Sequence, residues 1–322
     1  MGAVLGGSMS RSIALVVRAR CEDGEVLRLL RVAARQTLRP VEIGVIDSGS
    51  AKSILDELTR LSHTGVSCGP NAGRIPLRLL RIPAEEFQSA RALNHVIREV
   101  GADLVAILSQ DAIPADDRYF ERLSRAFEDA CTAGAYGRQR PPEPYDPIES
   151  KDLERTYPAR SRIQRAPDCW FVNTCSMIRR ELWELHPFAE QAVVSEDHQW
   201  AKQLQAAGWV IQYRADAEVL HHHHHYDDLR GIWRRFFDEA RGLAWVHAAG
   251  VGLPGALLGA TRETASDGLW LMRRGQLDHW PRAILRRWTK HAALYAGSRH
   301  GLRKRQQQVS NMPLHVKAED SS

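Results

Sequence analysis

Four short apolar stretches, each followed by a segment with helical spacing, alternate through the first 130 residues of this chain. The expected strands cover residues 13–17, 41–46, 77–82 and 104–108, and the expected helices cover 24–36, 51–61, 89–100 and 117–130. Strands that are apolar on both faces need cover on both sides, and helices between successive strands let them run parallel. The alternation predicts an α/β fold with a mostly parallel central sheet.

The rest of the chain is less regular. Residues 138–167 are rich in proline and charge and predict a long ordered loop or flap. From Leu229 the spacing is mainly helical, punctuated by Pro254 and Pro281. Between these parts we expect an apolar segment at 170–178, a helix near 197–207 and a strand near 209–213. We therefore divide the chain into an α/β domain at 11–228, a helical C-terminal extension at 229–312, and flexible tails at 1–10 and 313–322.

Composition excludes several classes of protein. The 322 residues are 43% hydrophobic, which suffices for a folded core. Five cysteines without CxxC spacing argue against a disulfide framework and favour a reducing cytoplasm. We find no run of roughly 18 apolar residues that would span a membrane, and no secretory signal at the N-terminus. We expect a soluble or peripheral protein.

The net charge of +5 suits phosphorylated ligands, anionic lipid or nucleic acid, and charge alone does not choose among them. Nucleic acid is the least favoured partner because no aromatic-basic motif accompanies the charge. Much of the excess positive charge lies late in the chain. It indicates either a surface that faces the substrate or an anionic membrane, or simply a solvated helix surface. These late basic residues are Arg286, Arg287, Lys290, Arg299, Arg303, Lys304 and Arg305.

Ligands of such a sheet bind beyond the carboxyl ends of its strands. The polar residues that follow the strands are Arg18 and Arg20, Asp47 and Ser48, and Gln110 and Asp111. Asp111 stands where a carboxylate could hold a divalent cation against a diphosphate. An aspartate after a strand is also a common turn residue or helix cap, and taken alone Asp111 fits that role better.

Three further polar features lie along the chain. Ser195-Glu-Asp-His198 opens a helix, either as a serine cap with favourable first-turn acids or as a source of a general base. His221 to His225 form a run of imidazoles that could complete a metal site or could simply lie on the surface. Ser89 could cap a helix whose Arg91 and Asn94 share one face, which suits either a phosphate or a surface salt bridge.

Together these parts resemble family 2 of the glycosyltransferases, in its bacterial rhamnosyltransferase-like branch, which has the GT-A fold. The resemblance covers roughly residues 12 to 312 and rests on the order and spacing of motifs that are each weak alone. The matching motifs are Val45-Ile-Asp-Ser-Gly-Ser50, Arg91-Ala-Leu-Asn94, Ser109-Gln-Asp-Ala112, Tyr136-Gly-Arg-Gln139, Asn173 with Ser176 to Arg180, Glu196-Asp197 with Trp200, His221 onward, Arg235-Phe-Phe-Asp238, and Arg299-His300 with Ser310-Asn-Met312.

The resemblance implies roles for several of the matched positions. Asp111 would ligate Mg²⁺ or Mn²⁺, and Asp197 would be the catalytic base with Glu196 supporting it. The family has a His-x-His near the third metal position. Here counting from the preceding strand favours His221 with His223, whereas counting back from Arg235 favours His223 with His225. Donor binding would fall to Arg18, Arg20, Asp47, Arg91, Asn94, Gln110 and Asp111. The sequence departs from the family at Ala90, where a glycine is usual, and in its reduced acidic metal motif.

The expected activity is transfer of a sugar, with inversion, from a nucleoside-diphosphate sugar to a saccharide or lipid-linked saccharide in polysaccharide biosynthesis. The branch favours dTDP-rhamnose as donor. Trp170, Phe171 and Asn173 could contact the acceptor, although aromatic residues there suit a core equally well. The basic tail could bring the protein to the inner face of a membrane. The alternative function is a non-catalytic nucleotide-sugar-binding or scaffold protein, which would release no nucleoside diphosphate.

Overall fold

The computed structural model describes residues 11–70, 72–143, 145–190, 195–221 and 228–311. The chain forms two compact units, neither of them continuous in sequence. The first comprises residues 1–140, 157–190 and 200–221, and the second comprises residues 141–156, 191–199 and 222–322. The expected division at residue 228 separates the chain differently, since the contacts group residues 141–156 with the C-terminal helices.

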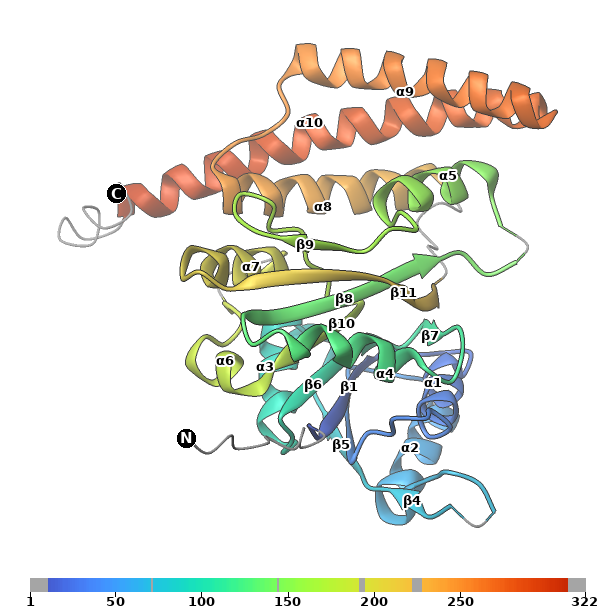
Figure 1. The fold of residues 1–322 in the computed structure, drawn as a ribbon. Helices are drawn as coiled ribbons and strands as arrows, with labels where there is room; N and C mark the ends of the chain where they lie inside the picture. The colour runs from blue at the N-terminus through green and yellow to red at the C-terminus, as the bar shows by residue number, and fades with distance from the viewer. Residues whose placement is uncertain (1–10, 71, 144, 191–194, 222–227, 312–322) are drawn as a thin grey trace, which may run out of the picture. The chain divides into compact units, whose positions relative to one another are not determined.

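The first unit is built on one large sheet with helices packed against it (Figure 1). Its strands are β1 (Ile13–Ala19), β2 (Glu42–Asp47), β5 (Leu77–Arg81), β6 (Leu104–Ser109), β7 (Ala112–Pro114), β8 (Thr132–Arg140), β9 (Arg162–Gln164), β10 (Cys175–Arg179) and β11 (Val210–His221). Its helices are α1 (Glu25–Ala33), α2 (Lys52–Thr64), α3 (Ser89–Arg98), α4 (Tyr119–Ser124) and α6 (Arg180–Leu185), and α7 (Glu196–Ala206) begins in the second unit. Strands β3 (Val66–Ser67) and β4 (Arg74–Ile75) form a separate ribbon.

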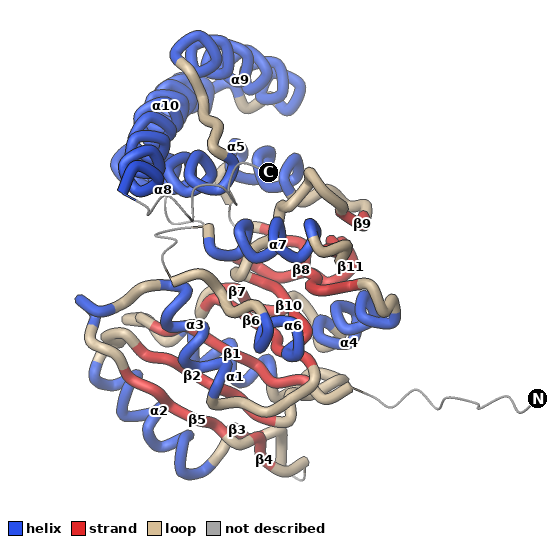
Figure 2. Tube along the Cα trace, turned by 90° about the vertical axis from the view of Figure 1, so that its left-hand side faces the viewer, coloured by secondary structure: helices blue, strands red, loops and turns tan. Residues whose placement is uncertain are grey.

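The strand order in the described sheet is β5-β2-β1-β6-β10-β8-β11-β7, with β9 paired to β11. Strands β5, β2, β1 and β6 lie side by side (Figure 2). They pair parallel, as the four strand-helix units predicted. Strand β10 then enters antiparallel between β6 and β8, while β8 and β11 run parallel to each other. The α/β class and the mostly parallel sheet are confirmed.

Helices cover both faces of the parallel part. On one face Leu15 and Val17 pack in a core with α1, α2 and α4. On the other face α3 approaches β2 so closely that a Cβ added to Gly44 would lie 2.7 Å from Val96. A glycine at this position therefore sets the distance between α3 and the sheet. This double cover explains why the strands are apolar throughout.

Two expectations about secondary structure were wrong. The helix expected over 117–130 is the short α4 followed by a 3-10 turn, and the Arg179 guanidinium binds the carbonyl oxygens of Phe127 and Asp129 at the end of that turn. The expected loop at 138–167 contains the end of β8, helix α5 (Pro147–Thr156) and strand β9. The strand expected near 209–213 extends to His221.

The second unit is helical and contains α5, α8 (Leu229–His247), α9 (Leu253–Arg274) and α10 (Trp280–Asn311). Among the described helices, none is both long enough and apolar enough to cross a membrane. Glycines allow close packing between α8 and α10, where a Cβ on Gly297 would lie 2.2 Å from the Phe237 carbonyl oxygen. All five cysteines are unbridged.

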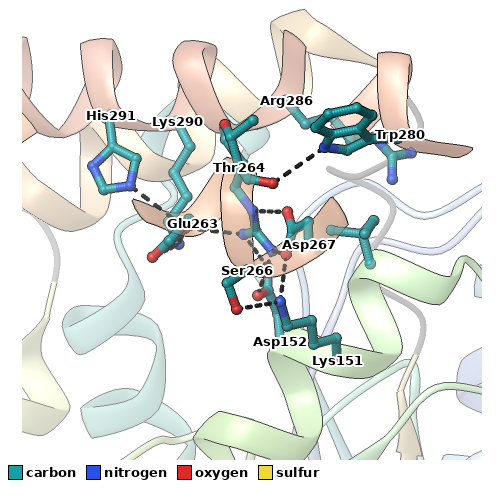
Figure 3. A network of polar contacts seen from close by, with 12 residues as sticks. Lys151, Asp152, Glu263, Thr264, Ser266, Asp267, Trp280, Arg286, Lys290 and His291 are labelled. Atoms are coloured by element: carbon teal, nitrogen blue, oxygen red, sulfur yellow. Dashed lines mark hydrogen bonds and ion pairs between the residues drawn. The ribbon is translucent and has the colours of Figure 1, made fainter. Parts of the chain in front are cut away.

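A charged network joins α5, α9 and α10 (Figure 3). The buried Arg287 guanidinium contacts Asp267 at 2.6 Å and Asp152 at 2.7 Å, and Lys151 lies 2.7 Å from Asp267. Burial alone would lower the pKa of Arg287, but its hydrogen bonds and the charges of Asp152 and Asp267 hold that pKa above its usual range. Part of the late basic sequence is therefore an internal ion network rather than a free surface.

Replacing Arg287 with methionine should lower the free energy of unfolding by about 3–5 kcal/mol, because it leaves Asp267 and Asp152 charged and deprived of their main cation. Urea denaturation followed by circular dichroism measures the change. Arg303→Met is the matched control, since Arg303 is exposed on the same helix. A loss below about 1 kcal/mol for Arg287→Met would mean that the network contributes no more than a surface ion pair.

Candidate functional site

The strand ends singled out from the sequence lie where β1 pairs with β2 on one side and β6 on the other. Arg18 pairs in register with Ser109 on β6, and Ala19 pairs with Asp47 on β2. The chain passes from β1 to β2 and β5 on one side and then returns to β6 on the other side of β1. In sheets of this kind, ligands bind beyond the carboxyl ends of the strands at such a reversal. The strand-end residues predicted from the sequence therefore meet at one edge.

Gln110 fastens the loop after β1 to the turn after β6. Its side-chain oxygen accepts from the Arg20 backbone N–H at 2.6 Å, and its side-chain nitrogen donates to the Arg20 carbonyl oxygen at 2.9 Å. Both ends of the amide are thus used within the protein. The structure gives Gln110 the task of positioning Asp111, which the sequence did not suggest.

Asp47 organises the turn that follows β2. Its buried carboxylate accepts from the backbone N–H groups of Gly49 at 3.1 Å and Ser50 at 3.2 Å. Gly49 has a φ of 112°, a conformation that side chains with a Cβ rarely adopt. Any contact between Asp47 and a nucleotide therefore starts from a carboxylate that already holds its own loop.

The side chain of Arg18, from the end of β1, reaches the start of α3. The Arg18 guanidinium donates to the Ser89 hydroxyl oxygen. The expectation that Ser89 caps α3 was wrong: the cap is Gln88, whose side chain accepts from the Arg91 backbone N–H at 2.6 Å. Ser89 is the first helical residue, so its hydroxyl is left to bind Arg18.

The side chains of Asp111 and His221 face each other across the sheet edge. Strand β7 pairs antiparallel with the end of β11, and His221 lies opposite Ala112 in that register. As a result the Nε2 atom of His221 lies 3.2 Å from the Oδ2 atom of Asp111, and both side chains are largely buried. Two residues 110 positions apart thus form one polar pair.

Gln139 on β8 binds the other nitrogen of the His221 ring. Its Oε1 atom lies 3.0 Å from Nδ1 of His221, and its Nε2 atom donates to the Tyr157 hydroxyl at 2.9 Å and to the Cys175 sulfur at 3.7 Å. Burial raises the pKa of the Cys175 thiol to about 12, so the thiol stays neutral. Because the Gln139 amide hydrogens are directed to Tyr157 and Cys175, its oxygen requires a hydrogen on Nδ1 of His221.

This tautomer has a chemical consequence. With hydrogen on Nδ1, a neutral His221 presents a lone pair on Nε2 to the carboxylate of Asp111, and two acceptors cannot bond directly. A second proton on the ring or a cation shared by the two side chains resolves the conflict. The pair can therefore be completed either by that proton or by a cation.

The sequence did not single out Gln139, Tyr157 or Cys175 for a role. Gln139 stood in the matched motif Tyr136-Gly-Arg-Gln139, but nothing in the sequence assigned it a function. Its contact with His221 could not be predicted, because it needs β8 and β11 to be neighbours. Within the described part of the chain, no group of three or more His, Cys, Asp or Glu side chains forms a metal cluster. His223, together with the rest of the run 222–225, lies outside the described residues.

Asn94 belongs to the framework of the fold. Its Oδ1 atom accepts from Trp183 Nε1 at 3.0 Å and from the Phe188 N–H at 3.1 Å, and its Nδ2 atom donates to the Phe188 carbonyl at 2.8 Å and to Glu190 at 3.2 Å. These four bonds use the whole capacity of the amide. The Asn94 amide therefore ties α3 to Trp183, Phe188 and Glu190. Arg91 is exposed and lies 3.5 Å from Glu190.

The residues expected to contact an acceptor differ in exposure. Phe171 is fully buried and packs against Tyr136 and Trp200, so it is a core residue. Asn173 is 2% exposed and accepts from the Ser176 hydroxyl at 3.4 Å, which places its side chain in the interior. Trp170 is only partly buried. Of the three, Trp170 is the one with surface available to a ligand.

Glu196 and Asp197 begin α7, as expected. Glu196 is 6% exposed, whereas Asp197 is only partly buried. Ser195 has a φ of 67°, outside the extended conformation usual for a serine cap. Asp197 lies in the second compact unit and Asp111 in the first.

His198, next to Asp197, is buried beside α8. Burial lowers the pKa of His198 to about 4, and the positive charges of His247 and Arg235 act in the same direction against Glu239. The unfolded chain, with an ordinary pKa near 6.5, binds the proton more strongly than the folded protein. This contribution to stability is complete above about pH 6.5 and is lost as the pH falls toward 4.

We therefore expect the free energy of unfolding to fall by at most about 3 kcal/mol between pH 7 and pH 4 on account of His198. Glutamine at this position cannot take up the proton. His198→Gln should consequently flatten the curve of unfolding free energy against pH in this window, measured by urea titration at each pH. An unchanged slope would show that the pKa of His198 is the same in the folded and the unfolded protein.

Comparisons with known proteins agree with this architecture. Residues 14–185 match the model of the family described as glycosyl transferase family 2. The O-antigen chain rhamnosyltransferase RfbN of Salmonella typhimurium is 27% identical over 220 residues, which are 65% of this chain and 65% of that protein. The O-antigen chain rhamnosyltransferase WbaN of Salmonella anatum is 26% identical over 214 residues, 63% of each chain. The match thus spans less than two thirds of each relative's length.

Solved structures show the same fold. A mannosyltransferase of Pyrobaculum calidifontis, PcManGT, determined with GDP-Man and Mn²⁺, superposes with a TM-score of 0.63 over 92% of this chain and 88% of its own, at 18% identity. Residues 1–349 of S. aureus TarS superpose with a TM-score of 0.51 over 92% of both chains, at 11% identity. The family match covers 172 of the 322 residues and includes the strand ends at Arg18, Asp47 and Asp111. The chain therefore belongs to glycosyl transferase family 2.

Proposed function

We propose that this protein transfers a sugar, with inversion at the anomeric carbon, from a nucleoside-diphosphate sugar to a saccharide or lipid-linked saccharide acceptor. The observation that carries the proposal is the Asp111–His221 pair at the reversal point of the sheet in a family 2 chain. Rhamnose is the favoured sugar because both curated relatives are named as O-antigen chain rhamnosyltransferases.

Asp111 and His221 are proposed to hold a divalent metal, Mg²⁺ or Mn²⁺. Ligand atoms about 2.1–2.2 Å from an octahedral ion lie roughly 3 Å apart when adjacent, and the two side-chain atoms here are 3.2 Å apart. One carboxylate and one imidazole leave most positions to ligand oxygens and water, which suits a diphosphate. A bound metal would supply positive charge to the departing diphosphate.

The other predicted site residues are proposed to activate the acceptor and to bind the donor. Asp197 is proposed to take the proton from the acceptor hydroxyl as its oxygen bonds to the anomeric carbon, while the bond to the nucleoside diphosphate breaks. Glu196 is proposed to support Asp197. Arg18 and Arg91 are proposed to attract the diphosphate at the start of α3, because the backbone N–H groups at a helix start also favour an anion. Asp47 and the Arg20 loop are proposed to face the nucleotide.

A screen of nucleoside-diphosphate sugars, with release of nucleoside diphosphate measured with and without Mn²⁺, tests the proposal. We expect one donor to support metal-dependent release that a saccharide acceptor accelerates. Binding of a donor without release, with every acceptor and metal tried, would favour the alternative of a non-catalytic nucleotide-sugar-binding protein.

Gln139→Leu should weaken Mn²⁺ binding by about 10- to 100-fold, the usual effect of removing the partner that orients a ligating histidine. Electron paramagnetic resonance of free Mn²⁺ measures the affinity without any need for turnover. Gln139→Glu keeps an oxygen that can accept from Nδ1 of His221, and it should restore most of the affinity. Equal affinity in Gln139→Leu and the wild type would separate Gln139 from the metal.

A further inference from the structure

Helix α9 has an apolar outer face. Positions 254, 258, 261, 265, 269 and 272 follow helical spacing, are all exposed, and hold proline, leucine, threonine, alanine, leucine and methionine. Leu258 is 71% exposed, Leu269 54% and Met272 53%. No charge lies in this line along a helix of 22 residues, about 33 Å long. Water therefore meets a continuous apolar strip.

The inner face of α9 carries the helix's acids. Glu263 is largely buried and lies 2.9 Å from Lys290. The fully buried Asp267 lies 2.6 Å from Arg287. Figure 3 shows both acids directed at basic side chains of α5 and α10. An ordinary surface helix buries its apolar residues and exposes its charges. In α9 both acids lie on the inner face while Leu258, Leu269 and Met272 are exposed, which suits the outer strip to a non-aqueous surface.

The exposed charges of α9 itself have one sign. Glu263 and Asp267 are the only acids of α9 and both point inward, whereas Arg262 and Arg273 are exposed at the edge of the strip. Helix α10, packed against α9, has no acidic residue in its 32 residues. The combination of exposed leucines and methionine with arginines alone complements an anionic, partly apolar surface.

We propose that the outer face of α9 binds the headgroup and upper acyl region of an anionic lipid bilayer, with the helix lying along the membrane. Leu258, Leu269 and Met272 enter the apolar layer, and Arg262 and Arg273 pair with lipid phosphates. The proposal goes beyond the proposed sugar transfer and does not depend on it, because binding to lipid is measured without substrate or turnover.

Co-sedimentation of the full chain with phosphatidylcholine vesicles, with and without phosphatidylglycerol, tests the proposal. The wild type should bind the anionic vesicles and bind the neutral ones more weakly. Leu258→Gln combined with Leu269→Gln should lower the vesicle partition coefficient by about tenfold or more, because two apolar side chains lose their transfer into lipid. Arg262→Gln combined with Arg273→Gln should cost about fivefold per arginine and remove most of the preference for phosphatidylglycerol.

Leu185→Gln is the matched control, because Leu185 is 72% exposed on α6 in the other unit and should have no effect on vesicle binding. Melting temperatures show whether each variant is folded. If the double leucine variant does not fold, the double arginine variant still tests the surface. Absence of wild-type binding to anionic vesicles would overturn the proposal, as would equal loss in Leu185→Gln. A different result would assign the strip to a second copy of this chain. In that case the wild type would not bind vesicles but would form dimers in sedimentation velocity, and Leu258→Gln combined with Leu269→Gln would convert them to monomers.

Discussion

Asp197→Asn should lower the rate of sugar transfer by about 10²- to 10⁴-fold, the usual contribution of a general base. Asparagine keeps the shape of the side chain and can still accept the 2.9 Å hydrogen bond from the His198 N–H. It cannot take up a proton at neutral pH. The affinity for nucleoside diphosphate, measured by calorimetry, should stay within about twofold because the base acts on the acceptor.

Glu196→Gln is the matched comparison at the neighbouring position. Glu196 is buried whereas Asp197 is partly exposed, so we expect Glu196→Gln to change the rate less than Asp197→Asn. A role for Asp197 confined to the helix start predicts instead a near-normal rate and about 1 kcal/mol less stability. Transfer by Asp197→Asn at the wild-type rate would remove Asp197 from the mechanism, and a larger loss in Glu196→Gln would assign the base to Glu196.

Asp111→Ala should reduce donor turnover by at least about 10²-fold, because it removes the carboxylate proposed to hold the metal against the diphosphate. The same variant should weaken Mn²⁺ binding measured by electron paramagnetic resonance, and excess EDTA should stop wild-type turnover to a similar degree. The melting temperature should change little, since the Asp111 side chain is not fully buried.

Asp117→Ala is the control for this second prediction. Asp117 is exposed six residues further along the chain, and its replacement should leave both turnover and Mn²⁺ affinity unchanged. Turnover that resists both EDTA and Asp111→Ala would contradict the metal role. Loss of turnover with unchanged Mn²⁺ affinity would instead move Asp111 to direct contact with the donor.

The strand-helix alternation determined the α/β class because a strand and its following helix are local features with their own spacing. Local spacing could not reveal where β10 enters the sheet, since its antiparallel partners β6 and β8 come from distant parts of the chain. Helix α5 was missed for a related reason. The prolines before it and its many charges look like a loop, and the charges of Lys151 and Asp152 are paired by Asp267 on α9 and Arg287 on α10, far along the chain.

At the candidate site the sequence by itself identified Asp111 and the histidine run, because a carboxylate after a buried strand and clustered imidazoles are visible in one dimension. Only the tertiary structure joined Asp111 to His221, through the short pairing of β7 with β11, and added Gln139 from the neighbouring strand. Residue type alone could not separate Asn94, whose amide is fully bonded inside the protein, from a ligand-binding asparagine. Folding brings each polar side chain the neighbours that occupy its donors and acceptors. For that reason only the tertiary structure decided which polar residues keep hydrogen-bonding groups for ligands.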